Sequence, residues 1–150
     1  MLQLHTLKNG AKAFVDYAHN QSSIRAILET LRPLTSDLIV IFGCGGERDK
    51  NRRPAMGLIA GIYGDKIIIT NDNARSEDPL QIAMDILSGV EAKNKNKVIL
   101  ELDRAKAISL AANRATPSSI IAILGKGHED YLIINNQRFY FDDFKEISKY

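Results

Sequence analysis

The sequence has few of the features that mark secreted, membrane-bound or nucleic-acid-binding proteins. Its single cysteine, Cys44, cannot form an internal disulfide, which fits a reducing cytoplasm. No apolar stretch reaches the roughly 18 residues that indicate a membrane span, and the N-terminus lacks the apolar segment of a signal peptide. The net charge is only +2, so no polyanion is indicated as a partner. These absences favour a cytoplasmic domain without nucleic-acid or membrane partners.

Standard phosphate-binding and metal-binding motifs are also missing, although two segments come close. Residues 43–54, GCGGERDKNRRP, follow an apolar run, but the third glycine position of a G-x-G-x-x-G loop holds Arg48. Residues 125–127 fail as a Walker A motif, because Ile120 occupies the place of its first glycine and Gly127 follows the lysine. No zinc-site spacing is present. The charged loops therefore need another explanation.

What the sequence does contain is a regular alternation of apolar runs and amphipathic segments. Strands are predicted at 13–17, 38–42, 66–70, 98–102 and 118–124. Helices are predicted from a cap at Ser22 or Ser23 through Leu31, from Pro54 through Tyr63, from Asp78 through Leu87, and over 104–114. This alternation, in a chain of 150 residues, predicts one α/β domain with a Rossmann-like, mostly parallel sheet of about six strands and helices on both faces.

The C-terminal part departs from that alternation. Residues 131–134 and 138–141 flank a polar turn and predict an antiparallel hairpin, which we expect to add at least one antiparallel strand to the sheet. Asp142 is predicted to cap a last short helix. The polar segment 91–97 is predicted to be a solvated loop.

Polar and charged residues gather directly after the predicted parallel strands, where open sheets of this kind bind their ligands. The planar forks of Arg48 and Arg75 suit a carboxylate, Glu129 can accept from an ammonium group, and Asn73 can both donate and accept. Taken together they match the zwitterionic head group of an amino acid. Taken singly, each also fits an ordinary surface ion pair on a loop.

The other candidate residues carry weaker signals. His19 and His128 both follow predicted strands, and either could contact phosphate or substrate. Cys44 is expected to be a small packed side chain rather than a nucleophile. Asp142 and Asp143 have the look of paired carboxylates, but a helix cap explains them better.

Four separated motifs together resemble the C-terminal domain of the Mur ligases. They are VDYAHN at 15–20, FGCGGERDKNRRPAMG at 42–57, TNDNARSEDP at 70–79 and GKGHEDY at 125–131. The resemblance covers essentially the whole chain. It implies that residues 1–150 are a single amino-acid-binding domain, and that the UDP-substrate domain and the central ATPase domain of such ligases are absent. Such a fragment is expected to be inactive alone, and it implies no catalytic residue and no metal ligand in this chain.

The resemblance also assigns site residues. The amino acid, implied to be meso-diaminopimelate, would be bound by Arg48, Asn73, Arg75, Gly125 and Glu129. The residues implied to face ATP are Asp16, Tyr17 and His19. Members that add diaminopimelate have a D-N-P-R signature, which here reads Asp72-Asn73-Ala74-Arg75. Replacing the proline is expected to loosen the turn, because φ is no longer fixed, while the retained arginine favours diaminopimelate over lysine.

The reaction implied is ATP-driven amide formation in peptidoglycan synthesis, with Mg²⁺ screening the phosphates. The carboxylate of UDP-MurNAc-L-Ala-D-Glu would be activated as an acyl phosphate, and the amine of diaminopimelate would attack it. Alternatives remain open at this point. They are a lysine-adding member, another ligase of the folylpolyglutamate or cyanophycin type, a stand-alone amino-acid-binding module, and a generic Rossmann-like domain.

Overall fold

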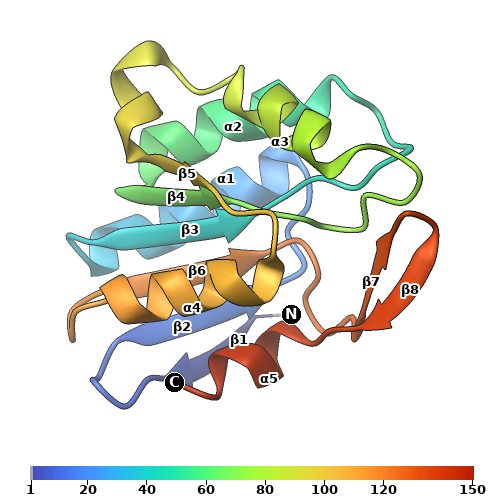
Figure 1. Ribbon diagram of the computed structural model, residues 1–150. Coiled ribbons are helices and arrows are strands. Elements are labelled where there is room, and N and C mark those ends of the chain that lie inside the picture. The colour runs from blue at the N-terminus through green and yellow to red at the C-terminus, as the bar shows by residue number, and fades with distance from the viewer. Residues whose placement is uncertain (1) are drawn as a thin grey trace.

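A six-stranded sheet forms the centre of the computed structural model, which describes residues 2–150 (Figure 1). The strand order is β1-β2-β6-β3-β4-β5. Neighbouring strands from β2 to β5 run parallel, and only β1 is antiparallel to its neighbour β2. The strands are β1 (Gln3–Thr6), β2 (Lys12–Asp16), β3 (Leu38–Phe42), β4 (Lys66–Ile69), β5 (Val98–Leu100) and β6 (Ile120–Leu124). The predicted α/β class and the mostly parallel sheet are confirmed.

Helices cover both faces of the sheet, as Figure 1 shows. One face packs against α1 (Gln21–Leu31), α2 (Arg52–Tyr63) and α3 (Pro79–Leu87), and the other against α4 (Arg104–Arg114) and α5 (Asp143–Ile147). The buried strand β3 shows how the sequence serves both layers. Leu38, Val40 and Phe42 join the first hydrophobic cluster, whereas Ile39 and Ile41 join the second. A continuous apolar run is what a strand covered on both faces requires.

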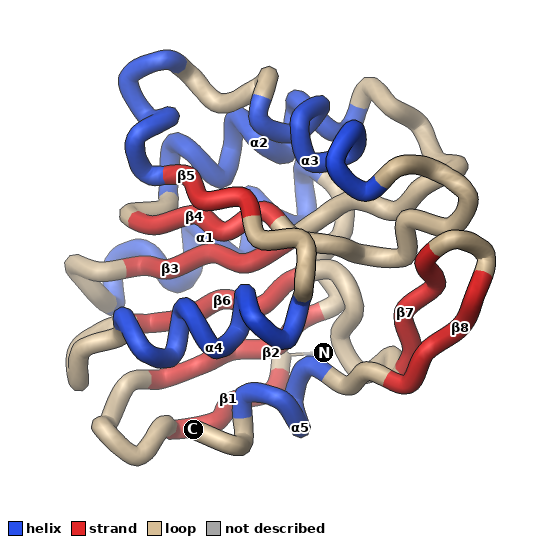
Figure 2. The backbone as a smooth tube through the Cα atoms, in the orientation of Figure 1, coloured by secondary structure: helices blue, strands red, loops and turns tan. Residues whose placement is uncertain are grey.

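The C-terminal hairpin does not extend the main sheet, so that prediction is wrong. Strands β7 (Tyr131–Ile134) and β8 (Gln137–Tyr140) form a separate two-stranded sheet that stands beside the central one (Figure 2). The hairpin pairs instead with the loop after β4, where the Arg75 amide donates to the Ile133 carbonyl at 2.9 Å. The antiparallel strand of the main sheet is β1, whose half-exposed residues gave no strand signal in the sequence.

The caps confirm the predicted starts of α3 and α5, whereas α2 begins at Arg52, two residues before the predicted Pro54, and has no side-chain cap. The Asp78 and Asp142 side chains accept from backbone amides at the starts of α3 and α5, as predicted. The N-cap of α1 is Asn20, not Ser22 or Ser23, because Asn20 accepts from the Ser23 amide while Ser23 reciprocates in a capping box. The segment predicted as a polar loop contains a 3₁₀ helix, η2 (Ala92–Lys97).

A second 3₁₀ turn, η1 (Arg32–Leu34), follows α1 directly. None of the helices within residues 2–150 combines the length and the apolar character needed to cross a membrane.

Candidate functional site

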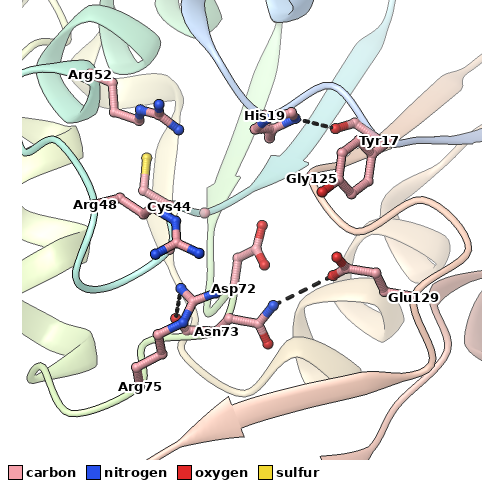
Figure 3. Close-up of a pocket in the computed structure, with 12 residues that line it drawn as sticks. Tyr17, His19, Cys44, Arg48, Arg52, Asp72, Asn73, Arg75, Gly125 and Glu129 are labelled. Atoms are coloured by element: carbon pink, nitrogen blue, oxygen red, sulfur yellow. Dashed lines mark hydrogen bonds between the residues drawn. The ribbon is translucent and has the colours of Figure 1, made fainter.

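A cavity of about 220 Å³ opens at the carboxyl ends of four adjacent strands, β2, β6, β3 and β4. It is drawn in Figure 3. This is the edge of a parallel sheet at which ligands bind. The lining residues come from the loops that follow these strands: Tyr17, His19, Gly43, Cys44, Gly45, Arg48, Arg52, Asp72, Asn73, Arg75, Gly125 and Glu129. Of the residues expected to bind ligand, the structure thus brings together all but Asp16 and the candidate His128.

The charges of the cavity are separated by sign. Figure 3 shows the guanidinium groups of Arg48, Arg52 and Arg75 on one side, and the carboxylates of Asp72 and Glu129 towards the other. Arg52 and Asp72 were not among the expected binding residues, although both stand in the charged post-strand segments of the sequence. A cavity with cationic and anionic sides can hold a molecule that carries both a carboxylate and an ammonium group.

The glycines after β3 allow two loops to touch rather than cradling a phosphate. We call residues 43–51 the β3 loop and residues 70–78 the β4 loop. The Gly46 amide donates to the Asn73 carbonyl at 2.9 Å, and a Cβ atom added at Gly46 would lie 2.0 Å from the Ala74 carbonyl oxygen. No side chain fits at such a distance. The loops that carry Arg48 and Arg75 are therefore in direct backbone contact.

The β4 loop is held in an unusual conformation by the hairpin. Asn73 and Arg75 both adopt positive φ values, of 50° and 56°, which non-glycine residues seldom do. The Asn73 Oδ1 atom accepts from the Ile133 amide at 2.9 Å, and its Nδ2 donates to Glu129 Oε1 at 3.4 Å. These contacts fix the turn in which buried Ala74 stands where the family signature has proline.

Asp72 is the buried carboxyl group of the cavity. Only 7% of the residue is exposed, and its carboxylate lies close enough to Gly125 that a Cβ there would meet Oδ2 at 2.4 Å. Burial raises the pKa of the Asp72 carboxyl, with the positive charge of Arg104 acting in the opposite direction. Asp72 lines the cavity, and Figure 3 shows its carboxyl group among the other side chains of the lining.

Arg104 ties together the strand ends beneath Asp72. Its guanidinium donates to the carbonyl oxygens of Asn71 at 2.7 Å and Leu124 at 3.1 Å, the residues that precede Asp72 and Gly125. It also forms a two-pronged ion pair with Asp143, with both N–O distances at 2.8 Å. Beside it Lys126 is fully buried and donates to the Tyr131 carbonyl, and burial lowers the pKa of this lysine.

The residues expected to face ATP are divided by the structure. Tyr17 and His19 line the cavity with rings 4.7 Å apart, and His19 Nδ1 lies 2.9 Å from the Tyr17 carbonyl oxygen. Asp16 lies at the end of β2, outside the cavity lining, where its Oδ2 accepts from the Ala18 amide at 2.9 Å. His128 is exposed and does not line the cavity.

Cys44 is a packed side chain, as expected. It is 3% exposed and its Sγ lies 3.4 Å from Met56 Sδ. Burial raises the pKa of the thiol to about 12, which suppresses the nucleophilic thiolate. Within the described part of the chain, no group of three or more histidine, cysteine, aspartate or glutamate side chains is placed to hold a metal ion.

The fold and the cavity define an α/β domain that binds its ligand at the carboxyl ends of parallel strands. The family described as "Mur ligase, glutamate ligase domain" matches residues 2–127, and the chain belongs to this family. Several proteins similar to this chain share one name. UDP-N-acetylmuramoyl-L-alanyl-D-glutamate–2,6-diaminopimelate ligase of Buchnera aphidicola subsp. Baizongia pistaciae is 47% identical over 94% of this chain and 28% of its own length.

Two further comparisons agree with this. The same-named ligase of Aquifex aeolicus is 45% identical over 90% of this chain and 28% of its own length. A solved structure of a ligase of that name superposes with a TM-score of 0.91 at 36% identity, covering 99% of this chain and 30% of the other. The chain thus spans less than a third of the length of these relatives. Folylpolyglutamate synthase of Mycobacterium tuberculosis, at 20% identity and a TM-score of 0.55, over 76% of this chain and 27% of its own, shares the fold alone.

Proposed function

We propose that this chain is the amino-acid-binding domain of an ATP-dependent ligase that adds meso-diaminopimelate to UDP-MurNAc-L-Ala-D-Glu in peptidoglycan synthesis. The observation that carries the proposal is the cavity with arginines on one side and carboxylates on the other. The relatives named as diaminopimelate ligases support the choice of amino acid. The buried, unpaired Cys44 supports a cytoplasmic location.

Diaminopimelate carries an amino-acid head group at each end, and the cavity suits one of them. In this proposal Arg75 and Arg48 bind the distal carboxylate, while Asp72 and Glu129 accept hydrogen bonds from the distal ammonium group. Because Gly125 has no side chain, the Asp72 carboxyl group can approach its backbone closely. Lysine has the ammonium but no distal carboxylate, so the two guanidinium groups would have no carboxylate of the amino acid to bind. A hydrogen bond to a charged group contributes roughly 1.5–3 kcal/mol, enough to discriminate strongly between the two.

The domain's part in the reaction is to position the nucleophile. With the distal head group held, the amine at the other end of diaminopimelate is presented to the activated carboxyl of the UDP-linked substrate, which replaces a bimolecular encounter by a fixed geometry. We assign Tyr17 and His19, at the rim, to the side that faces ATP, and Asp16 behind them. ATP supplies the activation of that carboxyl. Its phosphates and Mg²⁺ would be bound by the parts of the ligase outside this chain, since the described residues form neither a phosphate loop nor a metal site.

The proposal is tested by replacing Arg75 in the complete ligase. We expect Arg75→Ala to lower kcat/KM for diaminopimelate about 10- to 150-fold, the equivalent of one charged hydrogen-bonded contact, while the KM for ATP stays unchanged. Arg75→Lys keeps the positive charge but loses the planar guanidinium group. Its kcat/KM for diaminopimelate is expected to lie between those of the parent ligase and Arg75→Ala. Arg25→Ala, which removes a guanidinium from the exposed face of α1, is the control and should change neither constant. An equal loss for diaminopimelate and ATP in Arg75→Ala contradicts the assignment.

A further inference from the structure

The β3 and β4 loops are joined by a side chain that does not line the cavity. We propose that Glu77 is a positioning residue that fixes the β3 loop against the β4 loop and thereby sets the relative placement of Arg48 and Arg75. The proposal rests on the proposed function for its consequence, the recognition of a carboxylate. The connection that Glu77 makes between the two loops does not depend on which ligand the cavity binds.

The side chain of Glu77, in the β4 loop, contacts both the β3 loop and α2. Its Oε2 atom accepts from the Glu47 amide at 2.5 Å and from Arg53 Nη2 at 2.8 Å. Its own amide donates to the Ala74 carbonyl at 3.0 Å, within the β4 loop. Hydrogen bonds from Arg53 and from the Glu47 amide hold the pKa of Glu77 below its ordinary value, so the carboxylate is charged at neutral pH. One carboxylate oxygen thus connects the β3 loop, the β4 loop and α2.

The hydrogen bond from the Glu47 amide to Glu77 holds Glu47 in an unusual backbone conformation. Its φ is 57°, in the left-handed region that a glutamate seldom adopts without external support. The neighbouring Gly46 is bound to the β4 loop on both sides, through its amide to Asn73 and through its carbonyl, which accepts from Arg75 Nη1 at 2.9 Å. Arg48 follows immediately. If Glu77 were lost, the Glu47 backbone could relax to an ordinary conformation, and Arg48 would move relative to Arg75.

The chain offers a matched control for this role. Arg53 is only 1% exposed and donates to two carboxylates, Glu77 on the β4 loop and Asp85 on α3, the latter at 3.0 Å. The two carboxylates are partly exposed to a similar extent, with side-chain values of 21% and 30%. Only Glu77 also binds the Glu47 amide. Removing either acid weakens the pairing of Arg53, but only the loss of Glu77 frees the β3 loop.

The experiment compares Glu77→Ala, Glu77→Gln and Asp85→Ala in the chain by amide hydrogen exchange and by titration with meso-diaminopimelate. We expect Glu77→Ala to speed exchange of the Glu47 amide at least about tenfold and to weaken diaminopimelate binding about tenfold, the loss of one charge-assisted hydrogen bond. Glu77→Gln keeps an acceptor for the Glu47 amide. Its amide exchange rate and its affinity for diaminopimelate should therefore stay close to those of the parent chain. Asp85→Ala should leave both within about twofold of the parent chain.

Two results would overturn the proposal. One is exchange at Glu47 that is unchanged in Glu77→Ala. The other is an equal effect of Glu77→Ala and Asp85→Ala, which reduces Glu77 to a stabilising partner of Arg53. If the complete ligase does not use diaminopimelate, the proposed function fails, and the exchange rates at Glu47 still decide whether Glu77 positions the loop.

Discussion

The buried ion pair between Arg104 and Asp143 is predicted to be the most sensitive point of the fold. Arg104 is 2% exposed and Asp143 is fully buried. In Arg104→Met a side chain of similar length fills the space, but the Asp143 carboxylate loses both of its 2.8 Å partners. The carbonyl oxygens of Asn71 and Leu124 lose their guanidinium donor at the same time.

The expected cost follows from leaving a charge uncompensated inside the protein. Removing one member of a buried pair costs about 3–5 kcal/mol, a large part of the roughly 5–15 kcal/mol by which domains are stable. For a domain of this size, a loss of about 4 kcal/mol lowers Tm by roughly 8–16 °C. Since Arg104 also joins the backbone on either side of the cavity floor, Asp72 should become more mobile in the same variant.

Urea denaturation followed by circular dichroism measures this directly, with the free energy of unfolding compared at equal slope. The double variant Arg104→Met with Asp143→Leu removes the stranded charge and is expected to recover most of the loss, because a packed apolar pair replaces a buried ion pair at little cost. A single variant within about 1 kcal/mol of the parent chain would refute the reasoning, since it would mean that the pair contributes no more than an exposed one.

Two further predictions concern the walls of the cavity. Gly125→Ala places a methyl group against Asp72 at a φ of 114°, and is expected to cost roughly 1–3 kcal/mol in unfolding free energy and to abolish detectable diaminopimelate binding. Gly10 also has a positive φ, but a Cβ added there would meet nothing closer than 3.7 Å. Gly10→Ala should therefore lower the unfolding free energy less than Gly125→Ala and leave diaminopimelate binding intact. Equal effects of the two variants would contradict the contact between residue 125 and Asp72. Burial raises the pKa of Cys44 to about 12, so the thiol is protonated at pH 8. It should resist iodoacetamide in the folded chain and react after unfolding in urea, and rapid labelling of the native state, followed by mass spectrometry, would show that the thiol is not buried.

The parts of the fold that local pattern controls could be predicted from the sequence. The continuous run from Leu38 to Phe42 is a strand with those bounds because it must face two apolar layers. The helix after Asp78 could be predicted because an aspartate cap followed by Pro79 is typical of a helix start. The position of the cavity also followed, because the carboxyl ends of adjacent parallel strands converge on one edge.

The parts of the fold that depend on long-range backbone contacts could not be predicted from the sequence. The sequence near 131–140 does not indicate whether β7 pairs with Arg75 or with the main sheet. Both arrangements are compatible with the same pattern of apolar and polar residues. The close approach of Gly46 to Ala74 depends on two loops that are distant in the chain. Asp72 was seen only as part of a polar segment and of the D-N-P-R signature, because its place in the cavity depends on burial against Gly125 and on the nearby charge of Arg104.

The binding preference of the cavity is best measured by titrating the isotopically labelled chain with meso-diaminopimelate and, separately, with L-lysine while amide resonances are followed. We expect diaminopimelate to bind more tightly, with shifts concentrated at Gly45, at the segment from Asp72 to Arg75, and at Gly125 and Glu129. Equal affinity for the two amino acids, or shifts that fall outside these loops, would contradict a cavity that recognises a carboxylate and an ammonium group together.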